Sequence, residues 1–424
     1  MKRLIYLFVF TTLFAACSSD DNAPGAPEIK EIPLNETEKE MAEVSPNFAV
    51  DLLQAVDATI ENNEKFVVSP LSASMALSMA MNGAQGETYD QMAQALSFGD
   101  YSLDEINSYN NKLLTGLAAL ENQAQISIAN SLWLNEGFHT LAPYNNTVAK
   151  YYGATSETLE LSSDYARNRI NEWCKSNTNG LIPNFLEENL SSDCRLAIID
   201  ALHFKCPWLQ KFDKKKTKKD KFYAYDGTEQ EVEFMDIDEY VTPYMIKQGH
   251  GYQLYSLYFG KNKAFCMDFI VTYEKNELSV EECLNSLDNG NLAYIYNDES
   301  YKKERQNVCF RIPKFKIDFK EDLKDALHSM GIEDAFTSEA DFSKMAEINP
   351  DENLYINRVQ QANVFSIDEA GGEGASVTDV EIEVGTMNGQ FNGKRYCIIN
   401  RPFLFFVREN KTNTILFAGK VLKM

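Results

Sequence analysis

Side chains that usually carry catalysis are sparse in this 424-residue sequence. No histidine belongs to an H-E-x-x-H metalloprotease motif, and no G-x-S-x-G motif of serine hydrolases occurs. Gly371-Gly372-Glu373-Gly374 lacks dinucleotide-binding spacing and precedes a strand pattern, while Asn392-Gly393-Lys394-Arg395 lacks the earlier glycine and the Ser/Thr of a phosphate-binding loop. The sequence therefore predicts no enzyme, no metal and no cofactor. Only a catalytic site assembled from scattered residues stays open as an alternative.

The segment from Ser366 to Val384 suggests a conformational function instead of a catalytic one, because it has the pattern of a β-strand that need not be formed at all times. Its residues alternate between a small or apolar face and an acidic face, with a period of two. Glycines at its start weaken a strand, so the segment is able to switch between loop and strand. The first face carries Gly372, Gly374, Ser376, Thr378, Val380, Ile382 and Val384; the second carries Glu373, Ala375, Val377, Asp379, Glu381 and Glu383.

The elements that must position this segment follow an order typical of an α+β fold. The first half is mainly helical in pattern: residues 48–56, a helix capped by Ser69 with Pro70 in its first turn, and residues 166–174, with one strand over 126–134. Strands are predicted afterwards at 196–204, 222–235, 241–247, 253–258 and 264–271, followed by a helix over 323–330 closed by Gly331. Two apolar strands, 403–408 and 414–421, end the chain. We expect one large domain.

The N-terminus has the pattern of a bacterial lipoprotein signal. A basic start and an apolar run from Leu4 to Phe14 precede Cys17, and the ending resembles a lipobox. Cleavage after residue 16 and lipidation of Cys17 are expected, with Asp20-Asp21 marking export to the outer surface of the outer membrane. Residues 17–44 are predicted to be a flexible tether and residues 45–424 the domain. Ordinary secretion with an incidental cysteine is the alternative.

Charge and cysteine content exclude several classes of function. A net charge of −23 argues against binding to nucleic acid. The basic run from Lys211 to Lys221 is either a polyanion patch or a solvated loop edge, and we favour the loop edge. The seven cysteines after Cys17 show no C-x-x-C spacing, so neither a disulfide framework nor a zinc site is predicted. Most are expected to be buried apolar residues.

Blocks of sequence spread over residues 45–424 resemble the serpin family. The first are Val68-Ser69-Pro70-Leu71-Ser72 and Ala129-Asn130-Ser131-Leu132-Trp133. Many such blocks in family order make the resemblance specific. The others are Ile170-Asn171-Glu172-Trp173, Phe204-Lys205-Cys206-Pro207-Trp208, Ile312-Pro313-Lys314-Phe315, Ala340-Asp341-Phe342-Ser343, Asn400-Arg401-Pro402-Phe403 and Ile415-Leu416-Phe417-Ala418-Gly419-Lys420.

The resemblance implies three β-sheets, about nine helices and a reactive loop between Glu369 and Pro402. A target protease attacks the loop and forms an acyl-enzyme, and the cut loop then inserts as a new central strand of the main sheet. Gly372 to Val384 would span about 43 Å as a strand, long enough to carry the protease across the molecule. The native fold is then metastable and kinetically held, and the protein is expected to be a monomer.

The same resemblance assigns roles to individual residues. Ser69 and Ser72 are expected to form a latch at the centre of the sheet with Asp200 and Gln360, whose amide would donate to the Asp200 carboxylate. Trp208 marks the point where the loop enters, unless it is only a core residue. The hinge is assigned to Glu369, Gly371, Gly372, Glu373, Gly374, Ala375 and Ser376. Gly372 and Gly374 replace the family's threonine and alanine, which predicts slower insertion.

The scissile bond is placed in a window and not at one position. Counting forward from the hinge reaches Gly385, and counting backward from Pro402 reaches Phe391. Cleavage after Val384, Thr386 or Met387 is favoured, which suits elastase-like or subtilisin-like serine proteases, whereas Phe391 suits a chymotrypsin-like one. The loop contains no arginine or lysine between Glu369 and Lys394, so trypsin-like target proteases are not expected. A non-inhibitory serpin with a binding or structural role and a cysteine-protease inhibitor are the alternatives.

Overall fold

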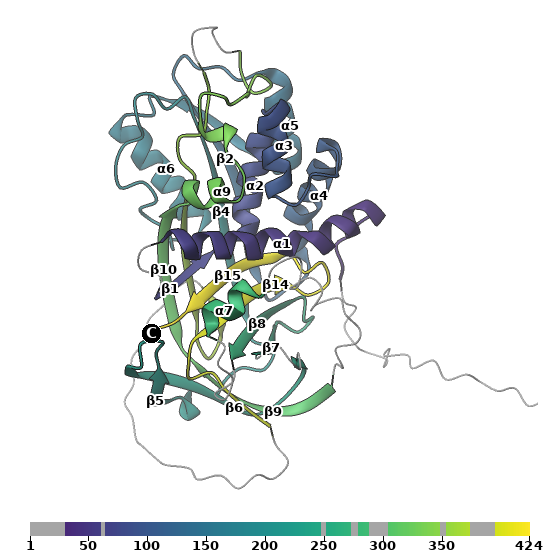
Figure 1. Ribbon diagram of the computed structural model, residues 1–424, viewed down its shortest axis with the longest axis vertical. Coiled ribbons are helices and arrows are strands. Elements are labelled where there is room, and N and C mark those ends of the chain that lie inside the picture. The colour runs from purple at the N-terminus through teal and green to yellow at the C-terminus, as the bar shows by residue number, and fades with distance from the viewer. Residues whose placement is uncertain are drawn as a thin grey trace, which may run out of the picture.

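The computed structural model describes residues 30–60, 64–246, 252–272, 279–287, 304–347, 353–373 and 395–424. In this part of the chain there are eight α-helices and fifteen strands, in an α+β arrangement (Figure 1). The expected signal peptide, the lipidation site Cys17 and residues 18–29 of the tether lie outside the described residues. Among the described helices none is long and apolar enough to cross a membrane.

The helices gather mainly around one end of the molecule, and α1 crosses its middle (Figure 1). Ser69 caps α2 and Pro70 occupies its first turn, as the sequence predicts. The bounds are α1 Glu36–Thr59, α2 Pro70–Met81, α3 Gly86–Ala95, α4 Leu103–Gly116, α5 Ala142–Tyr152, α6 Asp164–Asn177, α7 Val280–Asn285 and α9 Lys324–Ser329.

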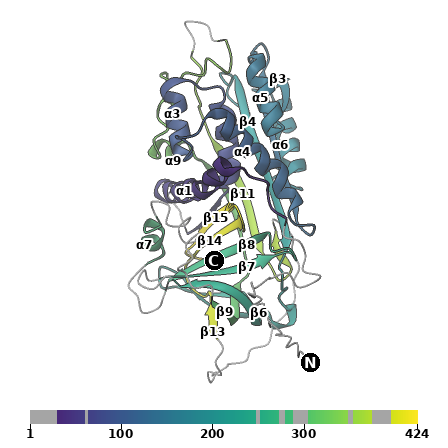
Figure 2. The ribbon, with the colours of Figure 1, turned by 90° about the vertical axis from the view of Figure 1, so that its right-hand side faces the viewer.

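A six-stranded sheet runs along the long axis of the molecule (Figure 2). Its strands lie in the order β10-β11-β12-β4-β2-β3, and α2 packs against β4. Because β12 comes from the segment that the sequence predicts to be loop or strand, this sheet is where the site must lie. The bounds are β2 Gln125–Asn135, β3 Thr155–Leu159, β4 Leu196–Pro207, β10 Phe315–Asp322, β11 Gln360–Ile367 and β12 Gly371–Glu373.

The remaining strands form one nine-stranded network that contains the other two expected sheets. Its order is β1-β15-β14-β8-β7-β6-β9-β13, with β5 beside β6. β6 pairs with β9 along most of its length but with β7 only from Tyr244 to Ile246, so the two sheets share this strand. The bounds are β1 Lys65–Val68, β5 Lys218–Tyr223, β6 Glu229–Ile246, β7 Tyr252–Phe259, β8 Phe265–Thr272, β9 Glu304–Pro313, β13 Arg395–Ile398, β14 Phe403–Glu409 and β15 Ile415–Val421.

Two expected boundaries in the strand region are wrong. A single segment over 222–235 is expected from the sequence, but a turn separates β5 from β6 there. Asp226 Oδ1 accepts hydrogen bonds from Thr228, and Gly227 adopts a φ of 79° that other residues rarely take. β6 then continues past residue 235 to Ile246, because an irregularity between Ile237 and Tyr240 absorbs the break without ending the pairing.

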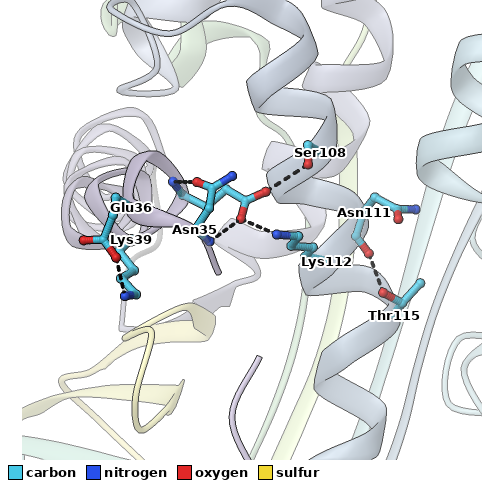
Figure 3. Close-up of polar contacts among 8 residues, drawn as sticks. Asn35, Glu36, Lys39, Ser108, Asn111, Lys112 and Thr115 are labelled. Carbon is cyan, nitrogen blue, oxygen red and sulfur yellow. Dashed lines mark hydrogen bonds and ion pairs between the residues drawn. The ribbon is translucent and has the colours of Figure 1, made fainter. Parts of the chain in front are cut away.

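The folded part also begins earlier than the tether predicted over 17–44 allows, because α1 starts at Glu36. Asn35 caps this helix in a reciprocal pair with Glu38, whose carboxylate accepts from the Asn35 N–H at 2.7 Å. Glu38 is buried and also bonds Ser108 and Lys112 of α4 (Figure 3). A glutamate read from sequence as part of an acidic tether is therefore an anchor between two helices.

Aromatic rings join the six-stranded sheet to the nine-stranded network. Phe365 of β11 stacks on Phe405 of β14 with ring centroids 5.3 Å apart, and it lies 5.3 Å from Phe417 of β15. Phe315 of β10 lies 5.4 Å from Phe405. Such a cluster is a rigid support, since each ring buries a large apolar area. It fixes β10 and β11 in place, so the position of β11 relative to α2 and β4 is well defined.

Candidate functional site: a hinge at the mouth of an incomplete sheet

The hinge begins as a short strand between the two central strands of the six-stranded sheet. After a turn at Asp368, whose N–H donates to the Gly371 carbonyl at 3.0 Å, β12 runs antiparallel to both neighbours. Gly372 is opposite Ile367 of β11 and Cys206 of β4, and Glu373 is opposite Lys205, with which its carboxylate forms an ion pair. The alternating pattern predicted from the sequence starts at Gly372, and its described residues, Gly372 and Glu373, do lie in a strand.

Gly371 is required by the close approach of two backbones. A Cβ atom at this position would lie 2.2 Å from the Cys206 carbonyl oxygen and 2.6 Å from Pro207 Cα. At Gly372 the nearest neighbours are ring atoms of Phe259, at 3.0 and 3.1 Å. A side chain is able to yield where a backbone is not, so glycine is obligatory at 371 and only preferred at 372.

Glu369, the first residue of the predicted hinge, is held by residues next to β5 and β10. Its carboxylate accepts from Thr217 Oγ1 at 2.7 Å and lies 3.4 Å from Lys314 Nζ, and its carbonyl accepts from the Phe212 N–H at 3.1 Å. Burial acts to raise the pKa of Glu369, but the Thr217 hydroxyl and the Lys314 charge outweigh it and lower the pKa. The hinge is thus anchored through an ionised carboxylate.

Trp208 lies where the hinge enters the sheet, as predicted, and is also a core residue. Its indole is 3% exposed and stacks on Phe259 with centroids 4.3 Å apart. Its indole N–H donates to the Asp368 carbonyl at 2.8 Å, and its backbone N–H donates to the Ala370 carbonyl at 3.0 Å. The two roles considered for this residue coincide, because the core ring is what holds the turn before β12.

Beyond β12 the centre of the six-stranded sheet is incomplete in the described residues. β4 pairs with β2 over its length, but on its other side it pairs only with the three residues of β12. A cavity of about 1330 Å³ lies in line with β12 between β4 and β11. Its floor is formed by small and apolar side chains of α2, including Ala73, Ala76 and Leu77. The space has the dimensions of a missing strand.

The latch predicted from Ser69, Ser72, Asp200 and Gln360 is not formed as expected: Ser72 bonds Asp200, but neither residue is bonded by Gln360 in the described structure. Ser69 is bonded by Gln361 and not by Gln360: the Gln361 amide accepts from the Ser69 N–H and donates to the Ser69 carbonyl, both at 2.9 Å. Asn363 Nδ2 supports it by donating to Gln361 Oε1 at 2.8 Å. Neighbouring strand residues face opposite sides of a sheet, so a misalignment by one residue selects the wrong glutamine.

Asp200 has fewer partners than the latch prediction requires. Its Oδ1 accepts from Ser72 Oγ, whereas its buried Oδ2 has no partner in the described part of the chain. The expected donor, the Gln360 amide, does not reach it. Burial raises the pKa of Asp200 to about 8, and the Ser72 hydroxyl offsets only part of this rise. Burial at the edge of the cavity thus favours the protonated form of this carboxyl group.

Three of the seven lysines in the basic run from Lys211 to Lys221 form ion pairs with acidic residues. Lys221 lies 2.7 Å from Glu229 and Lys219 lies 3.3 Å from Glu231, both across the β5–β6 pair, and Lys216 pairs with Asp238. This pattern agrees with a solvated strand edge and not with a polyanion site. The cysteines of the described residues are all free, and six of the seven are buried, as expected for small apolar side chains.

Several predicted site residues lie outside the described part of the chain. They are the hinge residues Gly374, Ala375 and Ser376 and the scissile window of Val384, Gly385, Thr386, Met387 and Phe391. Conversely, the sequence did not reveal Gln361, Asn363, Thr217 or Lys314 as parts of the site. The available signal was two polar residues at i and i+2, Gln361 and Asn363, on the face of β11 that continues with Phe365 and Ile367.

Comparisons with known proteins agree with this geometry. The serpin (serine protease inhibitor) family matches residues 43–424. Serpin B3 of Homo sapiens is 29% identical over 399 residues, covering 90% of this chain and 98% of that protein. The native-state structure of tengpin, a thermophilic serpin, has a TM-score of 0.78 at 30% identity and covers 94% of this chain and 96% of that one.

The same fold also occurs in a thyroxine-binding globulin complex with thyroxine, with a TM-score of 0.76 at 22% identity over 91% of this chain and 99% of that one. That similarity concerns the fold alone. The family match extends over nearly the whole described chain and includes the hinge and the incomplete sheet. This chain belongs to the serpin family, a family of protease inhibitors rather than of catalytic enzymes.

Proposed function

We propose that this protein is a suicide-substrate inhibitor of serine endopeptidases that traps the acyl-enzyme by inserting its cleaved loop into the six-stranded sheet. One observation carries the proposal: β12 is already seated between β4 and β11, directly in line with a strand-sized cavity. The strand that would fill the cavity is thus nucleated at one end. Nucleation favours fast insertion, because the remaining residues add one after another to strands that already exist.

The pairing register of β12 predicts how the cleaved loop would fit. Gly372 lies opposite Cys206 and Ile367, and continuing this antiparallel register by six residues brings Thr378 opposite Asp200 and Gln361. Paired residues share a face, so the small and apolar set from Gly372 to Val384 would cover α2 and the acidic set would face solvent. The Thr378 hydroxyl would then meet the polar centre of the latch.

The chemistry of the trap begins as ordinary proteolysis. The serine hydroxyl of the protease adds to the carbonyl carbon of the scissile bond, and an ester to the N-terminal part of the loop forms as the new amine departs. Water would normally hydrolyse this ester. Insertion moves the attached protease by about 43 Å over the thirteen residues from Gly372 to Val384, and strain on the acyl-enzyme then prevents hydrolysis.

The target class rests on the bait window, Val384 to Phe391. Its small and medium apolar residues suit elastase-like and subtilisin-like enzymes, and Phe391 suits a chymotrypsin-like one. We place the protein on the outer membrane, anchored through a lipid on Cys17, with a tether that ends before Ile32, which is buried in the core of the domain. A monomer outside the cell would meet proteases of the host or of competing bacteria.

The test is to mix the purified protein with elastase, subtilisin, chymotrypsin and trypsin and to separate the products on denaturing gels. A band at the summed mass that survives denaturation is expected with at least one of the first three, and the mass of the released C-terminal peptide gives the scissile bond. A peptide beginning after Lys394 or Arg395 would contradict the bait window. A papain-like protease tests the cysteine-protease alternative in the same format.

The second candidate is a serpin that binds a ligand or partner without trapping proteases. The glycines at 372 and 374 favour it to the extent that they slow insertion, since each costs about 0.5–1 kcal/mol in a strand. This second function replaces the inhibitor proposal if every protease tested cleaves the loop and remains active.

A further inference from the structure

The carboxyl group of Asp200 is an unusual element at the centre of a sheet that must open. Asp200 is a β4 residue opposite Asn130 of β2, and on the other side it borders the cavity of about 1330 Å³. Its Oδ1 accepts from Ser72 Oγ of α2, and its buried Oδ2 has no hydrogen-bond donor among the described residues. A buried oxygen without a donor strongly disfavours the carboxylate form.

No charged group near Asp200 compensates for this environment. The elements packed around it present Ser72 from α2, Asn130 from β2, and Gln360 and Gln361 from β11, none of which titrates. The other charged side chains that line the same cavity are Glu136, Asp193, Arg195, Glu347 and Arg358. Its other titratable groups are His139, Cys174, Cys194 and Tyr355. None of these nine forms an ion pair or hydrogen bond with Asp200 in the described structure.

Opening the sheet changes the surroundings of this group. In this structure, which has the closed sheet, β4 and β11 are separated by the cavity but Oδ2 is buried. When the two strands move further apart, water reaches Oδ2 and supplies the donor that it lacks. The closed sheet therefore retains a proton on Asp200 that the opened sheet releases. We propose that Asp200 is a positioning residue that couples opening of the six-stranded sheet, and with it the rate of loop insertion, to release of one proton. Its role in inhibition rests on the proposed function, whereas its role in opening does not.

The direction of the coupling follows from proton linkage. Burial raises the pKa of Asp200 from 3.8 to about 8 in the closed sheet. The stabilisation that the Asp200 proton gives to the closed sheet is complete below pH 4 and is lost as the pH rises toward 8. Opening is thus expected to become more favourable by up to about tenfold per pH unit across this range. An asparagine at this position mimics the protonated form and removes the dependence.

The first experiment is amide hydrogen exchange of β4 and β11 in the purified protein and in Asp200→Asn from pH 6 to pH 8. The intrinsic exchange chemistry cancels in the ratio of wild-type to variant rates at each pH. We expect this ratio to rise at least about tenfold over the two pH units. A ratio that does not change with pH would overturn the proposal.

His203 supplies the matched control, because it lies on the same strand and burial lowers its pKa. His203→Gln is expected to keep the pH dependence of exchange seen in the wild type. If His203→Gln loses this pH dependence while Asp200→Asn keeps it, the titrating group is His203 and not Asp200. If Asp200→Asn fails to fold, Ser72→Ala carries the test. Loss of the hydroxyl that lowers the pKa of Asp200 should shift the transition to higher pH, and an unshifted transition would contradict the proposal.

A second readout separates protonation from packing. The infrared carbonyl band of a protonated carboxylic acid should be present in the wild type at pH 7 and absent in Asp200→Asn, and its presence in both would overturn the assignment. A third readout is the fraction of loop cleavages that end in a trapped protease, expected to rise with pH in the wild type relative to the variant. If no protease is trapped at any pH, the proposed function fails while the exchange experiment still decides on Asp200.

Discussion

Two aspartates, the fully buried Asp268 in the nine-stranded network and the half-buried Asp200 in the six-stranded sheet, have opposite environments. Asp268 is fully buried, lies 2.6 Å from Arg408 Nε and accepts a hydrogen bond from Ser256. Its strand, β8, is paired along its length with β7 on one side and β14 on the other. Asp200 has one hydroxyl donor, and its strand is fully paired on one side only. A finished sheet thus encloses a neutralised charge, while an unfinished one keeps an acceptor without a donor.

The difference shows where the molecule is built to move. Pairing of β8 along its length with β7 and β14, and the packing of Phe405 and Phe417 against Phe365 of β11, leave this part of the nine-stranded network little space to rearrange. The six-stranded sheet holds a strand-sized cavity above a helix of small side chains. Rigidity in one region and an unfilled position in the other are the two properties that a loop-inserting inhibitor needs, since an inserted strand requires a fixed support.

The largest effect is expected from breaking the charge pair in the finished sheet. Arg408→Leu leaves Asp268 buried and unpaired, which should lower the free energy of unfolding by about 3–5 kcal/mol. The matched control is Asp220→Asn, whose pair with Arg311 is half exposed and should contribute less than about 1 kcal/mol. Urea unfolding rates of the two variants provide the measurement; similar rates would remove the contrast between the regions.

The corrected latch gives the next largest effect. Gln361→Ala leaves the buried Ser69 N–H without its partner and removes one of two donors to the Ser69 carbonyl, which keeps the Ala73 N–H, and we expect a loss of about 2–3 kcal/mol. Gln360→Ala, on the opposite face of β11, should change the stability by less than about 0.5 kcal/mol. Thermal unfolding of the pair measures this difference. Equal destabilisation by both substitutions would mean that the latch does not depend on register.

At the hinge, two adjacent glycines should respond differently to the same substitution. Gly371→Ala places a Cβ against the β4 backbone, which should displace β12 at a cost of about 1–3 kcal/mol and reduce the fraction of trapped protease. Gly372→Ala meets only the Phe259 ring and should change little. Fluorescence of Trp208, which bonds the turn before β12, reports the displacement. Identical spectra for both variants would argue that β12 does not need this close contact.

The smallest effect concerns the anchor of the hinge and its pH dependence. Glu369→Gln removes an ionised partner of Lys314 and should weaken the hinge by about 1 kcal/mol at neutral pH. The pKa of Glu369 is lowered in the folded protein, so this contribution is present above its ordinary value of 4.5 and disappears as the pH falls below it. The stabilities of wild type and variant should converge in acid; a constant difference would exclude the charge as its source.

Much of the fold follows from local sequence alone. Ser69 and Pro70 mark the start of α2, and the apolar run at 196–204 lies within β4, because capping and periodicity are properties of neighbouring residues. The start of α1 was missed because Glu38 looks like a solvent-exposed charge until Ser108 and Lys112 of α4 are placed beside it. Partners seventy or more residues away leave no local signal.

The same division holds at the site. The sequence by itself determined that a glycine-led strand pattern follows Glu369, since residue type and alternation suffice for that. That Trp208, Ser69 and Ser72 lie near it was implied by the resemblance to the serpins. Only the tertiary structure decided that Gln361 and not Gln360 bonds Ser69, that Gly371 must be glycine, and that one oxygen of Asp200 has no donor. Register, close approach and hydrogen-bond satisfaction depend on which distant atoms meet, and long-range packing alone fixes those contacts.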